Sequence, residues 1–371
     1  MALKGKILFT ASTYGHIRNF HPPYLRQFTE RGWRVHVACA GVPERVPYAE
    51  KAFALPFKKR IGSPANFRAA CTLRRIISAE GYDLISSHTS LASFFTRLAL
   101  LGMRNRPLLV NTVHGYLFDD ETPPLKRSLL LGAERMTAGV TDLLMVMNRT
   151  DERIAEKYGL GRRIVRIPGI GVNFAAFDEA KRLDKQAVRR ELGLPADAFV
   201  LLYPAEFSDR KSQRVLIEAM PQLPESVILA LPGDGARLER CRALAEKKRR
   251  KILFPGYVTD MGKWYAAADA LVSASRSEGL PFHIMEAMNM GLPVIASAVK
   301  GNADLIEDGK TGILYPYGNV NLFAADVLRL MKDDALRTAM AERARESVKQ
   351  YDLNRVLPLV MRQYESVIPP V

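Results

Sequence analysis

The alternation of short apolar segments with helical patterns constrains the fold of this chain most strongly. Six segments of the first half are predicted strands, at 6–11, 34–40, 83–87, 108–113, 142–148 and 164–168. Five more follow, at 199–205, 226–231, 252–255, 270–274 and 293–297. Helical patterns separate most of them, as over 66–80 and 150–158. Apolar strands alternating with helices are typical of parallel sheets covered on both faces. Two such series predict two doubly wound α/β domains.

The two series meet in a polar, charged stretch that is poor in strand patterns. This stretch runs from Gly169 to Pro195, and a chain of 371 residues is long enough for two domains. We therefore expect an N-terminal domain over residues 1–175 and a C-terminal domain over 176–350. Ligands of open α/β sheets bind at the carboxyl ends of the strands. The active site is accordingly expected in the cleft where the two domains face each other.

The most informative motif lies between two strands of the second series, over residues 277–296. A glycine turn, a proline suited to a first helical turn, and a helical stretch ending at Gly291 follow one another. The free N–H groups at such a helix start favour phosphate. Glu278 lies in the turn, whereas Glu286 lies among apolar residues of the helix. A carboxylate there needs a partner, and a ligand hydroxyl would satisfy it.

Glu278 and Glu286, with EG at the first and EAM at the second, resemble the signature of glycosyltransferase family 4. The resemblance covers nearly the whole chain. It implies the GT-B fold, with two Rossmann-like domains, and sugar transfer that retains the anomeric configuration. It also implies that a final helix, over 351–371, crosses back to the N-terminal domain. The runs at 16–21 and 113–116 resemble a subgroup that builds capsular or exopolysaccharide units.

The resemblance implies that the C-terminal domain binds a nucleotide sugar. Glu278 would contact the donor sugar side, Glu286 the ribose hydroxyls, and Lys211 the leaving diphosphate, whose charge it would neutralise. The family often has an arginine five residues before this lysine. This chain has Glu206 there, and Arg210 would compensate. Further donor-site positions are Gly233, Tyr257, Val258, Gly279, Leu280 and Phe282.

Structural roles remain open for the same residues. Lys211 could belong to a solvated loop beside a helix cap, Glu278 could be an N-terminal helix charge, and Glu286 could form a core ion pair. The Gly233-Asp234-Gly235 sequence is also common in plain turns.

The N-terminal domain would hold the acceptor. Gly15 and His16 follow the first strand, where a glycine turn entering a helix can place N–H groups beside the donor diphosphate. His114 ends a strand and corresponds to the family's cleft histidine, suited to hydrogen bonding or proton transfer near neutral pH. The sequence leaves open which of His16 and His114 is essential. His21 and His36 are interpreted as structural.

The resemblance implies transfer without a covalent protein nucleophile, with the leaving phosphate taking the acceptor proton. Catalysis would then rest on His114, Lys211 and Glu278 through positioning and charge stabilisation. The chain contains no Asp-x-Asp triplet, and no His/Asp cluster in it suggests a metal. We therefore expect metal-independent transfer, with a nucleotide sugar as co-substrate and no other cofactor. A UDP-sugar is expected rather than a GDP-sugar, whereas the identity of the sugar cannot be read.

The charge distribution suggests an anionic partner. Up to residue 180, 26 Lys and Arg stand against 15 Asp and Glu, which supplies +11 of the net +15. Apolar and basic residues interleave over 53–61, and the following helix adds Phe67 and Arg68. Such an edge can lie on an anionic membrane. An ordinary strand and solvated helix is the alternative.

The expected acceptor is a lipid-linked saccharide or glycan precursor, and the expected location is cytoplasmic, on the inner face of the membrane. Three widely spaced cysteines fit a reducing compartment. No run approaches the roughly 20 apolar residues that span a bilayer.

Other functions were weighed from the same residues. Glu206 and the single Gly15 leave open a non-catalytic GT-B subunit that binds a partner transferase or an anionic polymer. A sugar-nucleotide epimerase is a second alternative, against which the Glu278/Glu286 motif argues. The basic run 247–251 lacks an aromatic stacking platform, so nucleic acid is not an expected partner.

Overall fold

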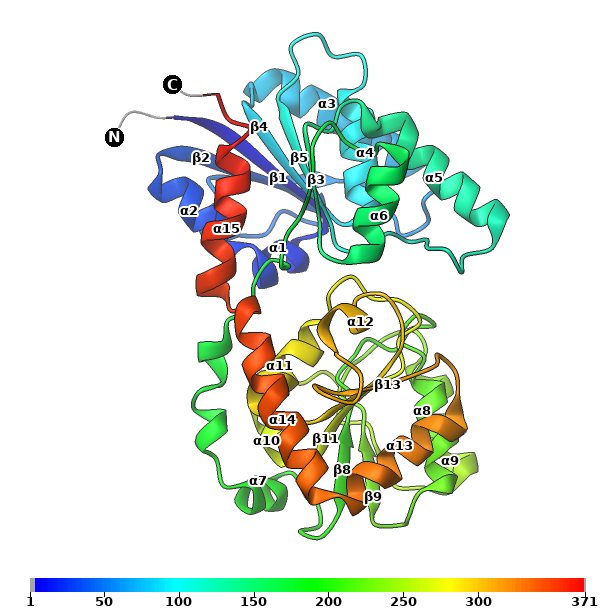
Figure 1. The fold of residues 1–371 in the computed structure, drawn as a ribbon. Coiled ribbons are helices and arrows are strands. Elements are labelled where there is room, and N and C mark those ends of the chain that lie inside the picture. The colour runs from blue at the N-terminus through cyan, green and yellow to red at the C-terminus, as the bar shows by residue number, and fades with distance from the viewer. Residues whose placement is uncertain (1–3, 370–371) are drawn as a thin grey trace. The chain divides into compact units, whose positions relative to one another are not determined.

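The chain forms two compact units, each built on its own parallel sheet (Figure 1). The structure, a computed structural model, describes residues 4–369. One unit comprises the chain up to Ile170 together with the residues from Arg355 onward, and the other comprises Gly171–Asn354.

The first unit contains a seven-stranded sheet in the order β3-β2-β1-β4-β5-β6-β7, and every neighbouring pair is parallel. Its strands are β1 (Gly5–Thr13), β2 (Trp33–Ala40), β3 (Lys51–Leu55), β4 (Leu84–His88), β5 (Leu108–Val113), β6 (Leu143–Val146) and β7 (Ile164–Arg166). Its helices are α1 (Tyr14–Phe20), α2 (Pro22–Glu30), α3 (Pro64–Glu80), α4 (Ser90–Leu100), α5 (Pro124–Ala138) and α6 (Arg149–Tyr158).

The last helix, α15 (Leu353–Glu365), packs on this first sheet from Arg355 onward. In Figure 1 it lies beside α2, and Arg31 pairs with Glu365 at 2.6 Å. Its Tyr364 is buried, and the hydroxyl lies 2.6 Å from Ser86 Oγ on β4. An aromatic ring with a satisfied hydroxyl anchors the helix over the sheet centre.

The second unit contains a six-stranded parallel sheet in the order β10-β9-β8-β11-β12-β13. Its strands are β8 (Phe199–Leu202), β9 (Val227–Ala230), β10 (Ile252–Leu253), β11 (Ala270–Ser273), β12 (Val294–Ser297) and β13 (Ile313–Tyr315). Its α-helices are α7 (Lys185–Glu191), α8 (Gln213–Ala219), α9 (Leu238–Lys248), α10 (Met261–Ala267), α11 (Phe282–Met290), α12 (Asn302–Leu305), α13 (Val320–Lys332) and α14 (Asp334–Val348). Short 3₁₀ turns are η1 (Phe174–Phe177), η2 (Ala180–Arg182), η3 (Met220–Gln222) and η4 (Lys349–Tyr351).

These two parallel, doubly wound sheets confirm the predicted fold class. All eleven predicted strands are present, several of them shorter than expected. β13 was not predicted, and β3 overlaps the segment 53–61, for which a strand was only the alternative interpretation. Both lie at sheet edges, where the pattern is weakest: β3 is largely unburied along its length and β13 has three residues.

In each sheet, successive strands are added on one side of the first strand and later ones on its other side, so the strand order reverses next to that strand. We call this place the switch point of the sheet. The reversal falls between β1 and β4 in the first unit, and between β8 and β11 in the second. Ligands of doubly wound folds bind at the carboxyl ends of the strands at this point. The residues that follow these four strands are therefore the first candidates for a site.

Candidate active site

Lys211 is a buried cation at the switch point of the second sheet. It lies at the end of the loop after β8, directly before Ser212, which is the N-cap of α8. Only 8% of Lys211 is exposed, and its Nζ lies 2.5 Å from Glu278 Oε1. Since a buried ammonium without a partner is costly, this pairing is what allows Lys211 to remain charged. The solvated-loop interpretation of Lys211 is therefore wrong.

Glu278 follows β11 and receives hydrogen bonds on both carboxylate oxygens. Arg210 donates to Oε2 at 2.8 Å, and Ser275 Oγ donates to Oε1 at 2.6 Å. Burial alone would raise the pKa of Glu278, but Lys211 and then Arg210 outweigh it and lower that pKa to about 2. The carboxylate is therefore ionised at neutral pH, and two cations flank it.

The glycines at 233 and 235 support the loop that carries Lys211. Both have positive φ, +145° and +149°. A Cβ on Gly233 would stand 2.1 Å from the carbonyl oxygen of Ala205, and one on Gly235 would stand 2.5 Å from that of Phe207. The Phe207 N–H also donates to the Asp234 carbonyl at 2.8 Å. Only glycine permits this approach of two backbones, so both residues shape the loop after β8.

Glu286 lies on α11, half-buried, and one of its two oxygens has a protein partner. The Tyr265 hydroxyl donates to Oε2 at 2.7 Å. Burial raises the pKa of the Glu286 carboxyl. No core ion pair to Glu286 occurs among residues 4–369, and within that range Oε1 accepts no hydrogen bond. The second oxygen remains available to a ligand.

The helix that carries Glu286 begins one residue later than the sequence suggested. Pro281 is the N-cap of α11 rather than part of its first turn, and Gly291 closes the helix with φ +76°. Gly279 and Leu280 therefore lie in the turn between β11 and α11, directly after Glu278, and Phe282 is the first residue of the helix.

The remaining donor-site predictions lie on the surface. Glu206 is exposed, and its carbonyl oxygen accepts a hydrogen bond from Gln213 Nε2 at 2.9 Å. Tyr257 is 76% exposed, and the neighbouring Val258 is half-buried in the loop after β10.

His283 is a buried residue beside this site that the sequence analysis missed. Its ring lies 5.6 Å from that of Tyr203, and its Nε2 has no hydrogen-bond partner among the described residues. Burial, with Lys211 next, lowers the pKa of His283 to about 3. Its place on the first turn of α11, five residues after Glu278, is the signal that could have found it.

His283 makes the stability of the protein pH-dependent. Its pKa is near 6.5 in the unfolded chain and about 3 in the folded one. The unfolded state therefore binds more protons below pH 6.5, and stability falls as pH falls, by about 1.4 kcal/mol per unit. We expect His283→Gln to reduce the loss of unfolding free energy between pH 7 and pH 5 by about 2 kcal/mol. Urea unfolding at both pH values checks this; parallel pH profiles of the two proteins would contradict it.

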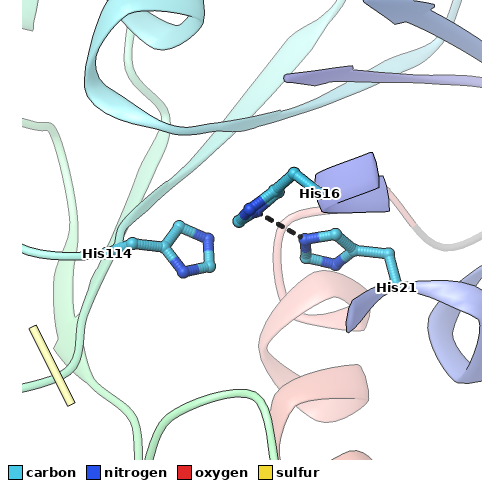
Figure 2. A group of neighbouring side chains, drawn as sticks. All are labelled: His16, His21 and His114. Atoms are coloured by element: carbon cyan, nitrogen blue, oxygen red, sulfur yellow. Dashed lines mark hydrogen bonds between the residues drawn. The ribbon is translucent and has the colours of Figure 1, made fainter. Parts of the chain in front are cut away.

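A cluster of histidines occupies the switch point of the first sheet. His16 lies on α1 after β1, His21 follows that helix, and His114 follows β5 (Figure 2). The Nε2 atoms of His16 and His21 are 3.3 Å apart, and the rings of His16 and His114 meet edge-on with centroids 4.8 Å apart. The fold thus brings together both predicted histidines. It also adds His21, which had been interpreted as structural.

His88, at the end of β4, is a fourth member of this cluster and was not predicted. Its Nδ1 lies 3.3 Å from His114 Nε2, and its Nε2 lies 2.8 Å from Ser86 Oγ. Ser86 in turn contacts the Tyr364 hydroxyl. This chain of contacts fixes the orientation of His88 and, through it, of His114. The position of His88 directly after a predicted strand next to β1 could have revealed it.

Burial keeps the histidine cluster neutral. It lowers the pKa of His16 to about 4. It also holds the pKa values of His21, His88 and His114 well below 6.5, and in these three the charge of neighbouring histidines lowers the pKa further. At neutral pH each ring has one nitrogen that carries an N–H and one that carries a lone pair. Such rings are suited to hydrogen bonding and to ligation, and they are weak bases.

Gly15 lies inside the first turn of α1 rather than in a turn before it. The helix begins at Tyr14, and Thr13 Oγ1 accepts from the His16 N–H at 3.3 Å. A Cβ on Gly15 would meet only Thr13 Oγ1, at 3.9 Å. The space beside this residue, next to His16, is open.

Family models match both parts of the chain. The model described as "Glycosyl transferases group 1" matches residues 184–347, and that described as "Glycosyltransferase Family 4" matches residues 24–172. The protein named "Putative glycosyltransferase EpsD" from Bacillus subtilis (strain 168) is 31% identical over 95% of this chain and 94% of its own. A UDP-Gal:alpha-D-GlcNAc-diphosphoundecaprenol alpha-1,3-galactosyltransferase from Escherichia coli is 26% identical over 80% and 79%.

Solved structures share the architecture. Anabaena HepE in complex with UDP and glucose has a TM-score of 0.78 at 20% identity and covers 98% of this chain and 100% of its own. The glycosyltransferase WaaG, involved in lipopolysaccharide biosynthesis, has a TM-score of 0.77 at 21% identity, over 98% and 100%. These likenesses establish the GT-B fold for the two parallel-sheet units. Together with the family matches, they show that this chain belongs to glycosyltransferase family 4.

Proposed function

We propose that this protein transfers a sugar from a UDP-sugar to a lipid-linked saccharide or glycan precursor, with retention of anomeric configuration, in the synthesis of a surface polysaccharide. The observation that carries this proposal is the buried Lys211–Glu278 pair at the switch point of the second sheet. A cation held there can stabilise charge on a leaving diphosphate. UDP is also the nucleotide bound by HepE, and a diphosphoundecaprenol-linked acceptor is named for the Escherichia coli relative.

The second unit supplies the donor contacts. Arg210, 47% exposed at its side chain, can turn from Glu278 towards a diphosphate. The available Oε1 of Glu286 can accept from a ribose hydroxyl, as acidic residues do in other nucleotide-binding folds. Lys211 and Arg210 provide the positive charge that a divalent ion would otherwise supply at the diphosphate. The transfer itself is therefore proposed to need no metal.

In the transfer, the bond from the anomeric carbon to the diphosphate oxygen breaks, and a bond to the acceptor oxygen forms on the same face. The acceptor proton passes to the leaving diphosphate, so atoms and charge balance. Because burial holds the pKa of His114 well below 6.5, its ring is a poor general base at neutral pH. We assign His114 the role of a neutral hydrogen-bonding group for the acceptor or the transferred sugar.

A transfer assay tests the proposal. UDP-sugars are incubated with the protein and a diphosphoundecaprenol-linked saccharide, and the product is analysed by NMR. The proposal predicts release of UDP and a product with the anomeric configuration of the donor. An inverted product would reject retention, and absence of any transfer across the common UDP-sugars would reject the function.

The proposal includes an anionic membrane surface at the inner face of the membrane as a partner. The loop after β3 and the start of α3 expose four basic and two apolar side chains, Lys58, Lys59, Arg60, Ile61, Phe67 and Arg68. Apolar residues inside a basic patch are typical of surfaces that lie on anionic lipid. Among residues 4–369, no helix combines the length and the apolar character needed to cross a bilayer.

Charge reversal tests the membrane surface. Each basic side chain near an anionic membrane contributes about 1 kcal/mol, so replacing Lys58, Lys59 and Arg60 by glutamate should weaken binding to vesicles with anionic lipid by roughly 100-fold or more. The matched control reverses Lys247, Lys248 and Arg250 in the other unit and should bind as wild type does. Cosedimentation measures both. Equal losses in the two variants would reject the assigned surface.

A further inference from the structure

The histidine cluster of the first unit has a feature that the proposed sugar transfer does not require. His16, His21 and His114 each offer one ring nitrogen, and these three atoms all lie within 4.8 Å of one another. Figure 2 shows the three rings converging from α1, from the residue after it, and from the turn after β5. The sequence hid this group, because His114 is 98 residues beyond His16 and no ligand spacing connects them.

The spacing of these nitrogens is close to what a metal ion requires. Zn²⁺ binds histidine nitrogen at about 2.0–2.1 Å, and tetrahedral angles then place two ligand nitrogens about 3.3–3.4 Å apart. The His16 and His21 Nε2 atoms are already 3.3 Å apart. The third nitrogen lies within 4.8 Å of the other two, so the rings must move closer before all three can bind one ion.

The donor set is chemically consistent with a transition metal. All three members of the group are imidazoles, which suit zinc, copper and nickel, whereas calcium and magnesium require oxygen ligands. Three histidines around zinc also leave a fourth position open for an oxygen ligand.

A second layer of contacts holds one of these ligands in place. His88 Nδ1 lies 3.3 Å from His114 Nε2, and Ser86 and Tyr364 fix His88 from behind. Outer hydrogen-bond partners of this kind orient ligating histidines in metalloproteins. The first unit thus contains three converging ligands and a support for one of them.

We propose that His16, His21 and His114 form a binding site for one divalent transition-metal ion, with Zn²⁺ favoured and a fourth coordination position open to an oxygen ligand. This ion is separate from the donor diphosphate, whose cations are Lys211 and Arg210 on the other unit. Zn²⁺ binding is measured without any sugar substrate, so it can fail without the transferase function failing. An ion on His114 would occupy the ring nitrogen assigned to the acceptor or the transferred sugar, because His88 faces the other one.

Calorimetric titration of Zn²⁺ into the full-length, tag-free protein tests the site, after treatment with a chelator and its removal. The expected result is binding of one ion per chain, together with a rise in Tm that a chelator reverses. Co²⁺ is a second probe, whose visible absorption reports tetrahedral nitrogen ligation. His16→Gln and His114→Gln should each weaken Zn²⁺ binding at least about tenfold, as loss of groups at a metal site does.

Two controls keep the result interpretable. Cys71, on α3, is an exposed thiol that could bind zinc by itself, and Cys71→Ser should bind Zn²⁺ as wild type does. Circular dichroism and thermal melts of both histidine variants establish that they are folded before titration. Absence of Zn²⁺ binding by wild type would overturn the proposal. So would full binding by the folded His16→Gln and His114→Gln proteins, or loss of binding in Cys71→Ser.

Discussion

Replacing Lys211 with methionine is expected to lower the rate of sugar transfer by roughly 100- to 1,000-fold, the cost of removing one preorganised group that stabilises developing negative charge. The buried Nζ of Lys211 is held 2.5 Å from Glu278, so it is positioned before substrate arrives. Methionine keeps an unbranched side chain that is one heavy atom shorter, and it removes the charge together with the N–H donors. UDP release under saturating acceptor measures the rate. Glu206→Ala, at an exposed position of the same loop, should retain a rate near that of wild type.

The same substitution should also destabilise the fold, and a second change separates the two effects. Lys211→Met leaves Glu278 buried with Arg210 and Ser275 as its remaining partners, at a cost of about 1–3 kcal/mol. Adding Glu278→Gln removes the buried charge that has lost its lysine partner, so the double variant should regain most of that stability without regaining transfer. Near-wild-type rates in Lys211→Met, or equal rates in Lys211→Met and Glu206→Ala, would reject Lys211 as the diphosphate contact.

Replacing Glu286 with alanine is expected to weaken nucleotide binding by about 2–3 kcal/mol, or roughly 30- to 150-fold in Kd, because hydrogen bonds from ribose hydroxyls to a carboxylate are lost. Tyr265 occupies only Oε2 of this carboxylate. Calorimetry with UDP measures the change without any acceptor. The stability cost should be small, since Glu286 forms no ion pair among the described residues.

Tyr265→Phe is the matched control for Glu286. It removes the protein's own hydrogen bond to the carboxylate and leaves the carboxylate in place, so nucleotide binding should fall much less than in Glu286→Ala. Unchanged UDP affinity in Glu286→Ala would contradict the ribose role. Equal losses in both variants would instead indicate that the two residues act only by shaping α11.

The sequence allowed the interior of both sheets to be predicted, because central parallel strands are apolar on both faces. β1 illustrates this: Ile7, Leu8 and Phe9 are all fully buried. The edge strands β3 and β13 lack that signature, since an edge strand is shorter and covered on fewer sides. The start of α11 was misplaced by one residue, because proline is compatible with both the N-cap and the first turn.

The site residues could be predicted where they belong to one local motif. Contacts between residues far apart in the sequence could not be predicted. Glu278 and Glu286 lie in one strand–turn–helix segment, whose order the sequence displays. The pairing of Glu278 with Lys211 spans 67 residues, and only the adjacency of β8 and β11 creates it. The partner of Glu286 was likewise unreadable, because Tyr265 belongs to a different helix.

The most direct test of the central claim is calorimetric titration of a panel of UDP- and GDP-sugars into the purified protein. A donor site built on Lys211, Glu278 and Glu286 predicts one-to-one binding of a UDP-sugar, with GDP-sugars weaker. If no sugar nucleotide binds, alone or with a lipid-linked acceptor and anionic vesicles present, the second unit is not a donor site and the proposed transferase function is wrong.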